Sequence, residues 1–346
     1  MKILALDLGK FKTVGCEYEA ETGRHRFVSV GTTPKALHDL LVELEPDRVV
    51  IEICSIAGWV CDLVRTLEIE IQVVNTNEEV WRWRKVKRKN DRRDALKAAQ
   101  LSAVNQIREV YVPEKEVREW RALITYRQRL VQRRTKIKNH IRDLLQREGI
   151  IVPARQKAWT ERGLAALSEL TQPLAQLPTE ELWRGELSLE LNQLRAVQAQ
   201  LETVEEKLNA LGEADTRVQL LRTIPGVGPR LAEAIVALLD KPERFRKSSE
   251  VSDYLGMVPK ELSSGETQRL GRITRQGNRV VRSLLVEVAW IGLRYNPWLR
   301  ETYQRISGGK KSRKKIAVVA AGRKLLVCCW AMLRDGTTWH WQPSRT

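Results

Sequence analysis

The amino-terminal third of the chain alternates between hydrophobic patterns that are typical of strands and of helices. Apolar and β-branched residues predict strands at 2–7, 13–18, 26–30, 48–53 and 69–74. Apolar residues at helical spacing predict helices at 33–44, 59–67 and 91–103. Because three hairpin-linked strands come first and helices separate the later strands, the pattern predicts an α/β domain with a mixed sheet.

A seven-residue repeat of leucine and isoleucine dominates the middle of the chain. In segment 116–147 the repeat consists of Leu123, Leu130, Ile137 and Leu144. Beyond a proline-containing stretch it returns as Leu187, Leu194, Leu201 and Leu208. Such heptads predict long helices that form either a helical hairpin or a coiled-coil interface between subunits, and the pattern fits both.

Glycine, proline and short apolar segments mark a third region, which begins after Gly212. We therefore predict three domains: an α/β domain at 1–110, a helical coiled-coil region at 111–212 and a mainly helical domain at 213–346. In the third region, Gly226 and Gly228 precede a predicted helix at 231–239. Glycines permit a tight turn whose N–H groups face a phosphate, as in a helix-hairpin-helix loop, and a simple turn is the alternative.

The overall charge of the chain points to a polyanionic partner. The 346 residues carry a formal net charge of +17, which favours DNA, RNA or an anionic membrane. No apolar run reaches the roughly 20 residues that cross a bilayer. The amino end is too short for a signal peptide and is interrupted by Asp7. We therefore expect a cytoplasmic protein that acts on nucleic acid and has no membrane partner.

Four acidic residues stand out from this background. Asp7 ends an apolar strand, and Glu52 stands within Val-Val-Ile-Glu-Ile. Asp91 and Asp94 are three residues apart at a helix start, where acids also complement the helix dipole. Reactive groups gather at the carboxyl ends of adjacent strands, so the four carboxylates are candidates for one site. Oxygen ligands favour Mg²⁺ or Mn²⁺, and two such ions about 4 Å apart would support phosphoryl transfer.

Basic side chains flank these acids and recur further along the chain. The segment before Asp91 carries Arg82, Arg84, Lys85, Lys87, Arg88 and Lys89. The later positions of this kind are Arg133, Arg134, Arg272, Arg275, Lys310, Lys311 and Lys314. One-signed charge favours phosphate contact, and a solvated face is the alternative at each place. Arginines also surround Ser263 and Ser264, but no histidine lies nearby in sequence, so the residues alone make neither serine a nucleophile.

Several short motifs along the chain match one known family. At the amino end they are Asp7, Glu52 and the run Lys89-Asn-Asp-Arg-Arg-Asp-Ala95. Near the carboxyl end they are Ile224–Pro229, Leu255–Pro259, Ser263-Ser-Gly265 and Gly277–Arg282. In these motifs the chain resembles the DEDD insertion-sequence transposases, the bridge-RNA-guided serine recombinases with a RuvC-like domain.

The resemblance implies a ribonuclease H-like (RuvC-like) fold for the first domain and a transposase domain at the carboxyl end. It implies that Asp7, Glu52, Asp91 and Asp94 bind magnesium. It further implies that Ser264 attacks DNA to form a phosphoserine link, with Ser263 as the alternative nucleophile. Donor DNA, target DNA and a non-coding bridge RNA are the implied partners. The implied assembly is a homo-oligomer, a dimer or a tetramer, in which the metals of one subunit meet the serine of another.

We therefore predict a magnesium-dependent DNA transposase that cleaves, exchanges and religates strands through a serine–DNA intermediate, guided by RNA. A junction-resolving endonuclease that uses only the four acids is the first alternative. A non-catalytic nucleic-acid-binding scaffold is the second, and such a scaffold has no need for four mutually repelling acids.

Overall fold

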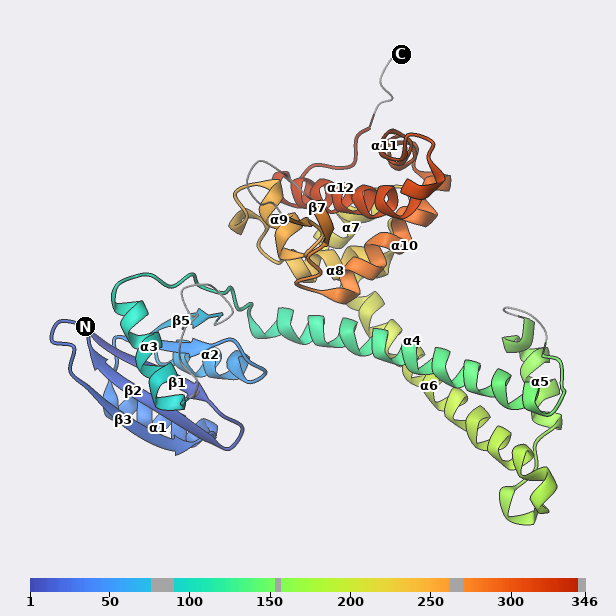
Figure 1. The fold of residues 1–346 in the computed structure, drawn as a ribbon, viewed down its shortest axis with the longest axis horizontal. Coiled ribbons are helices and arrows are strands. Elements are labelled where there is room, and N and C mark those ends of the chain that lie inside the picture. The colour runs from blue at the N-terminus through green and yellow to red at the C-terminus, as the bar shows by residue number, and fades with distance from the viewer. Residues whose placement is uncertain (76–89, 153–156, 262–269, 342–346) are drawn as a thin grey trace. The chain divides into compact units, whose positions relative to one another are not determined.

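The computed structural model describes residues 1–75, 90–152, 157–261 and 270–341. The chain forms two compact units, Met1–Arg118 and Glu119–Thr346, shown in Figure 1. The helical middle of the chain belongs to the second unit, because its leucines share one hydrophobic core with the carboxyl-terminal helices. The division into three functional domains remains a prediction.

A five-stranded mixed sheet forms the centre of the first unit, with strand order β3-β2-β1-β4-β5. The strands are β1 (Lys2–Leu8), β2 (Lys12–Glu19), β3 (His25–Gly31), β4 (Arg48–Glu52) and β5 (Glu70–Val74). The first three pair antiparallel, whereas β4 is parallel to both β1 and β5. The predicted mixed sheet is confirmed, and β1 and β4 are neighbours at its centre.

Helices cover both faces of this sheet. On one face, α1 (Pro34–Leu44) and α2 (Ala57–Thr66) pack against Leu4, Leu6, Val49 and Ile51. On the other, α3 (Asp91–Ala103) places Ala99 against Ile3, Ala5 and Val50. Side chains alternate between the faces of a strand. The odd-numbered residues of β1 and the even-numbered residues of β4 therefore face α3.

Two long antiparallel helices, α4 (Lys115–Arg147) and α6 (Leu182–Ala214), carry the heptad residues. Arg127 pairs with Glu205, and His140 lies 2.8 Å from Glu186, so the helices run in opposite directions. The repeat residues Leu130, Ile137, Leu144, Leu187, Leu194, Leu201 and Leu208 are all buried. The hairpin that the sequence allowed is therefore present within one chain, and a coiled-coil interface between subunits remains a prediction.

The remainder of the second unit is mainly helical, as predicted. Its helices are α5 (Glu161–Glu169), α7 (Thr216–Arg222), α8 (Pro229–Leu239), α9 (Ser248–Tyr254), α10 (Arg279–Tyr295), α11 (Pro297–Ser307) and α12 (Lys314–Asp335). Short 3₁₀ turns occur at Lys157–Trp159, Leu174–Gln176, Thr179–Glu181, Pro242–Arg244 and Lys311–Arg313. A two-stranded antiparallel hairpin, β6 (Pro259–Glu261) and β7 (Leu270–Ile273), lies between α9 and α10 in sequence.

Contrary to the expectation that no apolar run reaches bilayer-spanning length, the segment Lys311–Asp335, which contains α12, is long and apolar enough to cross a bilayer by length and composition. Half of its most apolar window is buried inside the folded unit. Its residues Ala321, Leu325 and Cys329 belong to the same core as α8 and α10. This packing identifies α12 as a core helix of the carboxyl-terminal unit.

A buried ion pair lies where α8 meets α6. Glu233 is 1% exposed, and its carboxylate lies 3.2 Å from Nη1 of Arg230. Gly212 of α6 leaves room for it, since a Cβ there would come within 2.8 Å of Oε1 of Glu233. Burial raises the pKa of Glu233 to about 7, although the nearby Arg230, Arg127 and Arg222 act to lower it.

This raised pKa predicts that the free energy of unfolding falls as pH rises. The folded chain holds a proton on Glu233 between the ordinary pKa of 4.5 and the folded value of about 7. The stabilisation is complete below the lower value and is lost as pH rises through the higher one. We expect Glu233→Gln to flatten this slope in urea unfolding curves at several pH values. Glu206→Gln, at an exposed acid of α6, should keep the slope. Equal slopes in both variants would contradict the assignment.

Candidate metal centre and nucleic-acid interface

Asp7 and Glu52 lie beside each other at the ends of the two central strands. The last paired residues of β1 and β4 are Leu6 and Ile51, and each acid is the next residue along its strand. By the alternation of side chains, both acids share the face with Ile3, Ala5 and Val50. Both side chains are half-buried. The parallel pairing of β1 and β4 therefore places two carboxylates at the carboxyl-terminal ends of the two strands, on the face covered by α3.

The other two acids lie in the first turn of α3. Asn90 caps the helix, and its side chain accepts a hydrogen bond of 3.1 Å from the backbone N–H of Arg92. Asp91 is four residues before the buried Ala95, and Asp94 is four residues before Ala98, which packs on the sheet. Residues four apart share a helix face, so Asp91 and Asp94 lie on the side of α3 that carries Ala95 and Ala98. Asp91 is exposed and Asp94 is half-buried.

Polar contacts at the far end of α3 set its direction. Arg48, the first residue of β4, donates to the carbonyl oxygen of Ser102 at 3.4 Å, and Ser102 donates to Gln72 at 2.6 Å. The carboxyl end of α3 is therefore anchored at the amino end of β4. Its first turn points toward the carboxyl ends of the central strands, which carry Asp7 and Glu52 (Figure 1).

All four acids offer carboxylate oxygens, which are the ligands that a hard divalent cation prefers. Within the described ranges of the chain, however, no three Asp, Glu, His or Cys side chains stand close enough together to hold a metal ion. Nearby, burial lowers the pKa of Lys97, one turn beyond Asp94, and the charge of Asp94 opposes that effect. The structure thus brings the acids to one region without assembling a coordination shell, and their role as ligands remains a prediction.

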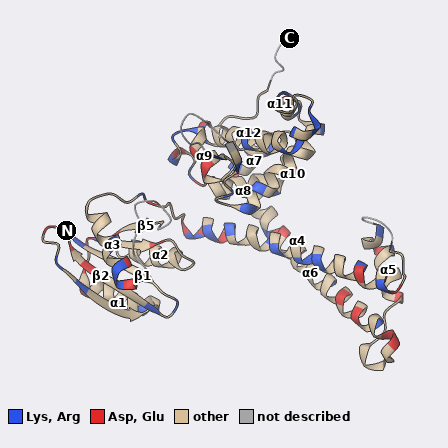
Figure 2. Cartoon of the chain, in the orientation of Figure 1, with Lys and Arg blue, Asp and Glu red and all other residues tan. Residues whose placement is uncertain are grey.

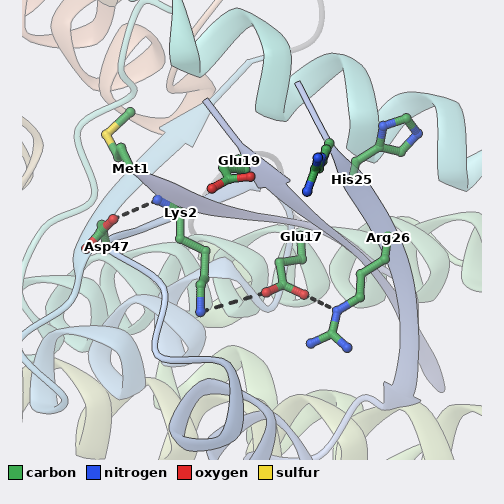
Figure 3. A pocket seen from close by; sticks show the side chains of 8 residues that line it. Met1, Lys2, Glu17, Glu19, His25, Arg26 and Asp47 are labelled. Atoms are coloured by element: carbon green, nitrogen blue, oxygen red, sulfur yellow. Dashed lines mark hydrogen bonds and ion pairs between the residues drawn. The ribbon is translucent and has the colours of Figure 1, made fainter. Parts of the chain in front are cut away.

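A different pocket, of about 520 Å³, lies at the opposite end of β1, where Lys2 stands (Figure 3). Its charged groups neutralise one another. Glu17 pairs with both Lys2 and Arg26, and the backbone N–H of Lys2 donates to Asp47 at 2.6 Å. We therefore do not assign the chemistry to this pocket.

Many of the predicted nucleic-acid contacts lie outside the described residues. These are Arg82, Arg84, Lys85, Lys87, Arg88 and Lys89, together with the serine candidates Ser263 and Ser264. The described strands that precede and follow the serine segment in sequence, β6 and β7, pair antiparallel.

The predicted basic positions that the structure does describe are on the surface. Figure 2 shows Lys and Arg along α4, where Arg133 is exposed and Arg134 half-exposed. Arg127 is different, because it pairs with Glu205 on α6. The other exposed positions are Arg272, Arg275, Lys310, Lys311 and Lys314. Their binding of nucleic acid remains a prediction, but each is accessible to a phosphate.

The two glycines of the predicted phosphate loop have different surroundings. Gly226 adopts φ +90°, and a Cβ on it would lie 3.3 Å from the Cα of Gly292 in α10. Gly228 is exposed and forms the N-cap of α8, and a Cβ added to it would meet no atom within 4 Å. The tight turn is present, and its role as a helix-hairpin-helix phosphate loop remains a prediction. Gly226 also serves the packing of α10, a role that the local sequence does not reveal.

Sequence reasoning missed one feature of the carboxyl-terminal unit. Glu287 and Trp290 line an open cavity together with Arg275, Arg279 and Arg282. The signal was the three- and four-residue spacing from Arg279 to Trp290 along one predicted helix. That spacing becomes informative only once the opposite face of the helix is known to be buried.

Comparison with known proteins identifies the family. A model of the IS110-type DEDD transposases, described as "Transposase", matches residues 4–149. A second model, described as "Transposase IS116/IS110/IS902 family", matches residues 218–304. The two matched segments together make up more than half of the chain.

Two relatives that are named transposases align with most of the chain, and a relative with a different name aligns with part of it. The "Probable family 20 transposase" of Pseudomonas aeruginosa is 29% identical over 310 residues, 88% of this chain and 89% of that protein. The transposase for insertion sequence element IS1111A of Coxiella burnetii is 29% identical over 268 residues, 73% of this chain and 68% of that protein. The "Pilin gene-inverting protein" of Moraxella lacunata is 26% identical over 130 residues, 37% of this chain and 40% of that protein. With a ribonuclease H-like DEDD domain at its amino end and a mainly helical carboxyl-terminal part, the chain belongs to the IS110-family transposases of insertion sequences.

Proposed function

We propose that this transposase is a magnesium-dependent DNA recombinase that cleaves, exchanges and religates strands through a covalent serine–DNA intermediate. One observation supports the proposal: Asp7 and Glu52 end neighbouring strands on the sheet face that α3 covers, and Asp91 and Asp94 lie in the first turn of α3. A stable sheet does not require four acids there. Their collection suits a site that holds cations against a phosphodiester.

In this proposal the four carboxylates would hold one or two Mg²⁺ or Mn²⁺ ions. Such ions supply charge neutralisation and orientation for the attacking and leaving oxygens of a phosphoryl transfer. The acids themselves contribute oxygen ligands from two rigid strand ends and from the first turn of a capped helix. Rigid elements keep ligands in place more accurately than loops do, which favours catalysis.

We assign Ser264 as the nucleophile, with Ser263 as the alternative. Its hydroxyl oxygen would form a bond to phosphorus as the bond from phosphorus to the departing strand end breaks. The serine proton leaves, and the departing oxygen becomes a strand hydroxyl. Attack by the hydroxyl of a new strand then restores a phosphodiester and returns the serine. Because the linkage conserves bond energy, exchange and religation need no separate energy source.

The proposed partners follow from the same scheme. Donor and target DNA are the substrates, and a non-coding bridge RNA would select them by base pairing. The net charge of +17 and the exposed basic residues of α4 and α12 support contact with both polyanions. We also propose a dimer or tetramer in which the acids of one subunit work with the serine of another, in the cytoplasm and without a membrane partner.

The direct test is to trap the intermediate. The full chain, purified with its co-purifying RNA, is incubated with DNA that carries the element's ends, in Mg²⁺ or in EDTA, and is then denatured. We expect a protein–DNA adduct that survives denaturation and forms only with Mg²⁺. Cleavage without any adduct would favour the junction-resolving endonuclease instead. Absence of both cleavage and metal binding would favour a scaffold.

A further inference from the structure

An open cavity of about 910 Å³ lies along one side of α10. Arg279, Arg282, Val286 and Trp290 follow one another at three- and four-residue spacing, so they line a single helix face. The opposite face, with Leu285 and Ala289, is fully buried in the core. The cavity is therefore held on a rigid helix, and its lining is the part of α10 that packing does not use.

One end of the cavity is strongly positive. Arg275, Arg279 and Arg282 line it, and Glu287 is the one acid among the described lining residues. Nη1 of Arg282 donates to the carbonyl oxygens of Leu255 at 2.9 Å and Gln276 at 2.6 Å, which holds that guanidinium in place. Burial lowers the pKa of Arg282, and the neighbouring Arg275 and Arg279 lower it further.

The backbone at this end is unusual as well. Arg275 adopts φ +61°, in the left-handed region that residues other than glycine and asparagine rarely occupy. Its N–H donates to the carbonyl oxygen of Gly256 at 3.0 Å, which secures this conformation. The held guanidinium of Arg282 and the two neighbouring arginines form a site for an anion, because an anion relieves their mutual repulsion.

The other end of the cavity is aromatic and apolar. Trp290 is 42% exposed although it lies on a packed helix. Its ring is braced by Tyr303 of α11, with the ring centroids 6.0 Å apart. Val286 lies one turn before it on the same face. A braced and partly exposed indole is a suitable platform for a planar ring.

We infer that this cavity binds an unpaired nucleotide of a nucleic-acid strand, with its phosphate at the arginines and its base on Trp290. The inference rests on the proposed action on DNA strands and adds that one nucleotide leaves the base stack. A duplex hides its base faces, so Trp290 can stack only on a base that is unpaired. The volume is within the range of small-ligand sites, which suits a nucleotide and not a duplex.

Glu287 gives the cavity a basis for discriminating among bases. It lies one turn before the Trp290 end of the cavity and is exposed to it. A carboxylate accepts a hydrogen bond from the exocyclic amino group of cytosine, whereas thymine presents a carbonyl oxygen at the same position, which a carboxylate repels. We therefore expect the cavity to prefer cytosine to thymine.

A crosslinking experiment with the full chain tests the location. A single-stranded pentanucleotide that contains 5-iododeoxycytidine is irradiated with the protein in EDTA, and the crosslinked peptide is identified by mass spectrometry. We expect the crosslink at Trp290. In parallel, fluorescence anisotropy measures binding of labelled cytosine and thymine pentanucleotides, as DNA and as RNA, and of a DNA duplex.

Substitutions on α10 provide matched comparisons. Trp290→Ala should weaken single-strand binding about ten-fold, and Trp290→Phe should largely preserve it. Glu287→Gln should abolish the preference for cytosine. Tyr295→Ala and Arg294→Ala, which alter exposed residues of the same helix outside the cavity lining, should bind as the unmodified protein does. If the substitutions weaken binding of the DNA and RNA pentanucleotides equally, the cavity recognises the phosphate and the base. If they weaken one more than the other, the more affected nucleic acid is the one that the cavity binds.

A crosslink away from the cavity, or unchanged binding by Trp290→Ala, would overturn the inference. So would an equal loss of duplex binding, since that would indicate a duplex contact. The serine–DNA adduct is scored separately. An adduct with no nucleotide in the cavity refutes this inference alone, and a filled cavity with no adduct refutes the proposed function alone.

Discussion

Replacing Ser264 with alanine is expected to abolish the covalent protein–DNA adduct and to reduce strand exchange by about 10³-fold or more. The reason is chemical: alanine has no oxygen to bond to phosphorus. DNA binding should change little, because the hydroxyl is a small part of the interface. The measurement is the fraction of labelled DNA that migrates with the protein on a denaturing gel, beside a filter-binding assay.

Two comparisons make the result specific. Ser249→Ala, at an exposed position on α9, should form the adduct at the normal rate. Ser263→Ala separates the neighbours: if it loses the adduct while Ser264→Ala keeps it, the nucleophile is Ser263. If both variants form adducts as the unmodified protein does, the serine mechanism is wrong.

Replacing Asp7 with asparagine is expected to reduce Mg²⁺-dependent cleavage by about 10³-fold or more, since the side chain keeps its shape but loses its charge. Asp7 lies on the inner face of the central strand, beside Glu52 and beneath α3. The readout besides activity is Mn²⁺ binding, followed by electron paramagnetic resonance, which should weaken clearly.

Stability measurements distinguish a lost ligand from a damaged fold. In EDTA the melting temperature of Asp7→Asn should equal or exceed that of the unmodified protein, because removing one of several like charges relieves repulsion. Added Mg²⁺ should raise the melting temperature of the unmodified protein more than that of the variant. Asp39→Asn, on α1 at the other face of the sheet, is the matched control and should change neither property. Normal Mn²⁺ binding by Asp7→Asn would remove Asp7 from the ligand set.

Local patterns were sufficient to predict most of the first unit. The strand at 48–53 and the helix at 91–103 agree with β4 and α3 to within a residue, because each has a clear periodicity and bounded ends. The candidate acids were also visible in the sequence, since Asp7 and Glu52 interrupt apolar strands. The parallel pairing that makes them neighbours was not visible, because register between distant strands depends on contacts that no local window contains.

The heptads illustrate the same limit. A leucine repeat predicts that one helix face will be buried, but it does not predict which partner will cover that face. The pairs from Arg127 to Glu205 and from His140 to Glu186 show that α4 and α6 bury that face against each other within one chain. Only the three-dimensional arrangement could decide this, because an intramolecular hairpin and a dimer bury similar side chains.

By itself, the sequence determined the periodicity of each element, the positive charge of the chain, the residue types of the candidate metal site and the motifs that indicate its family. The tertiary structure decided which of those residues are neighbours. It placed Asp7 and Glu52 at neighbouring strand ends, directed Gly226 against α10, and left Arg279, Glu287 and Trp290 around a cavity. The physical reason is that periodicity is a property of neighbouring residues, whereas a site is made by packing among residues far apart in the chain.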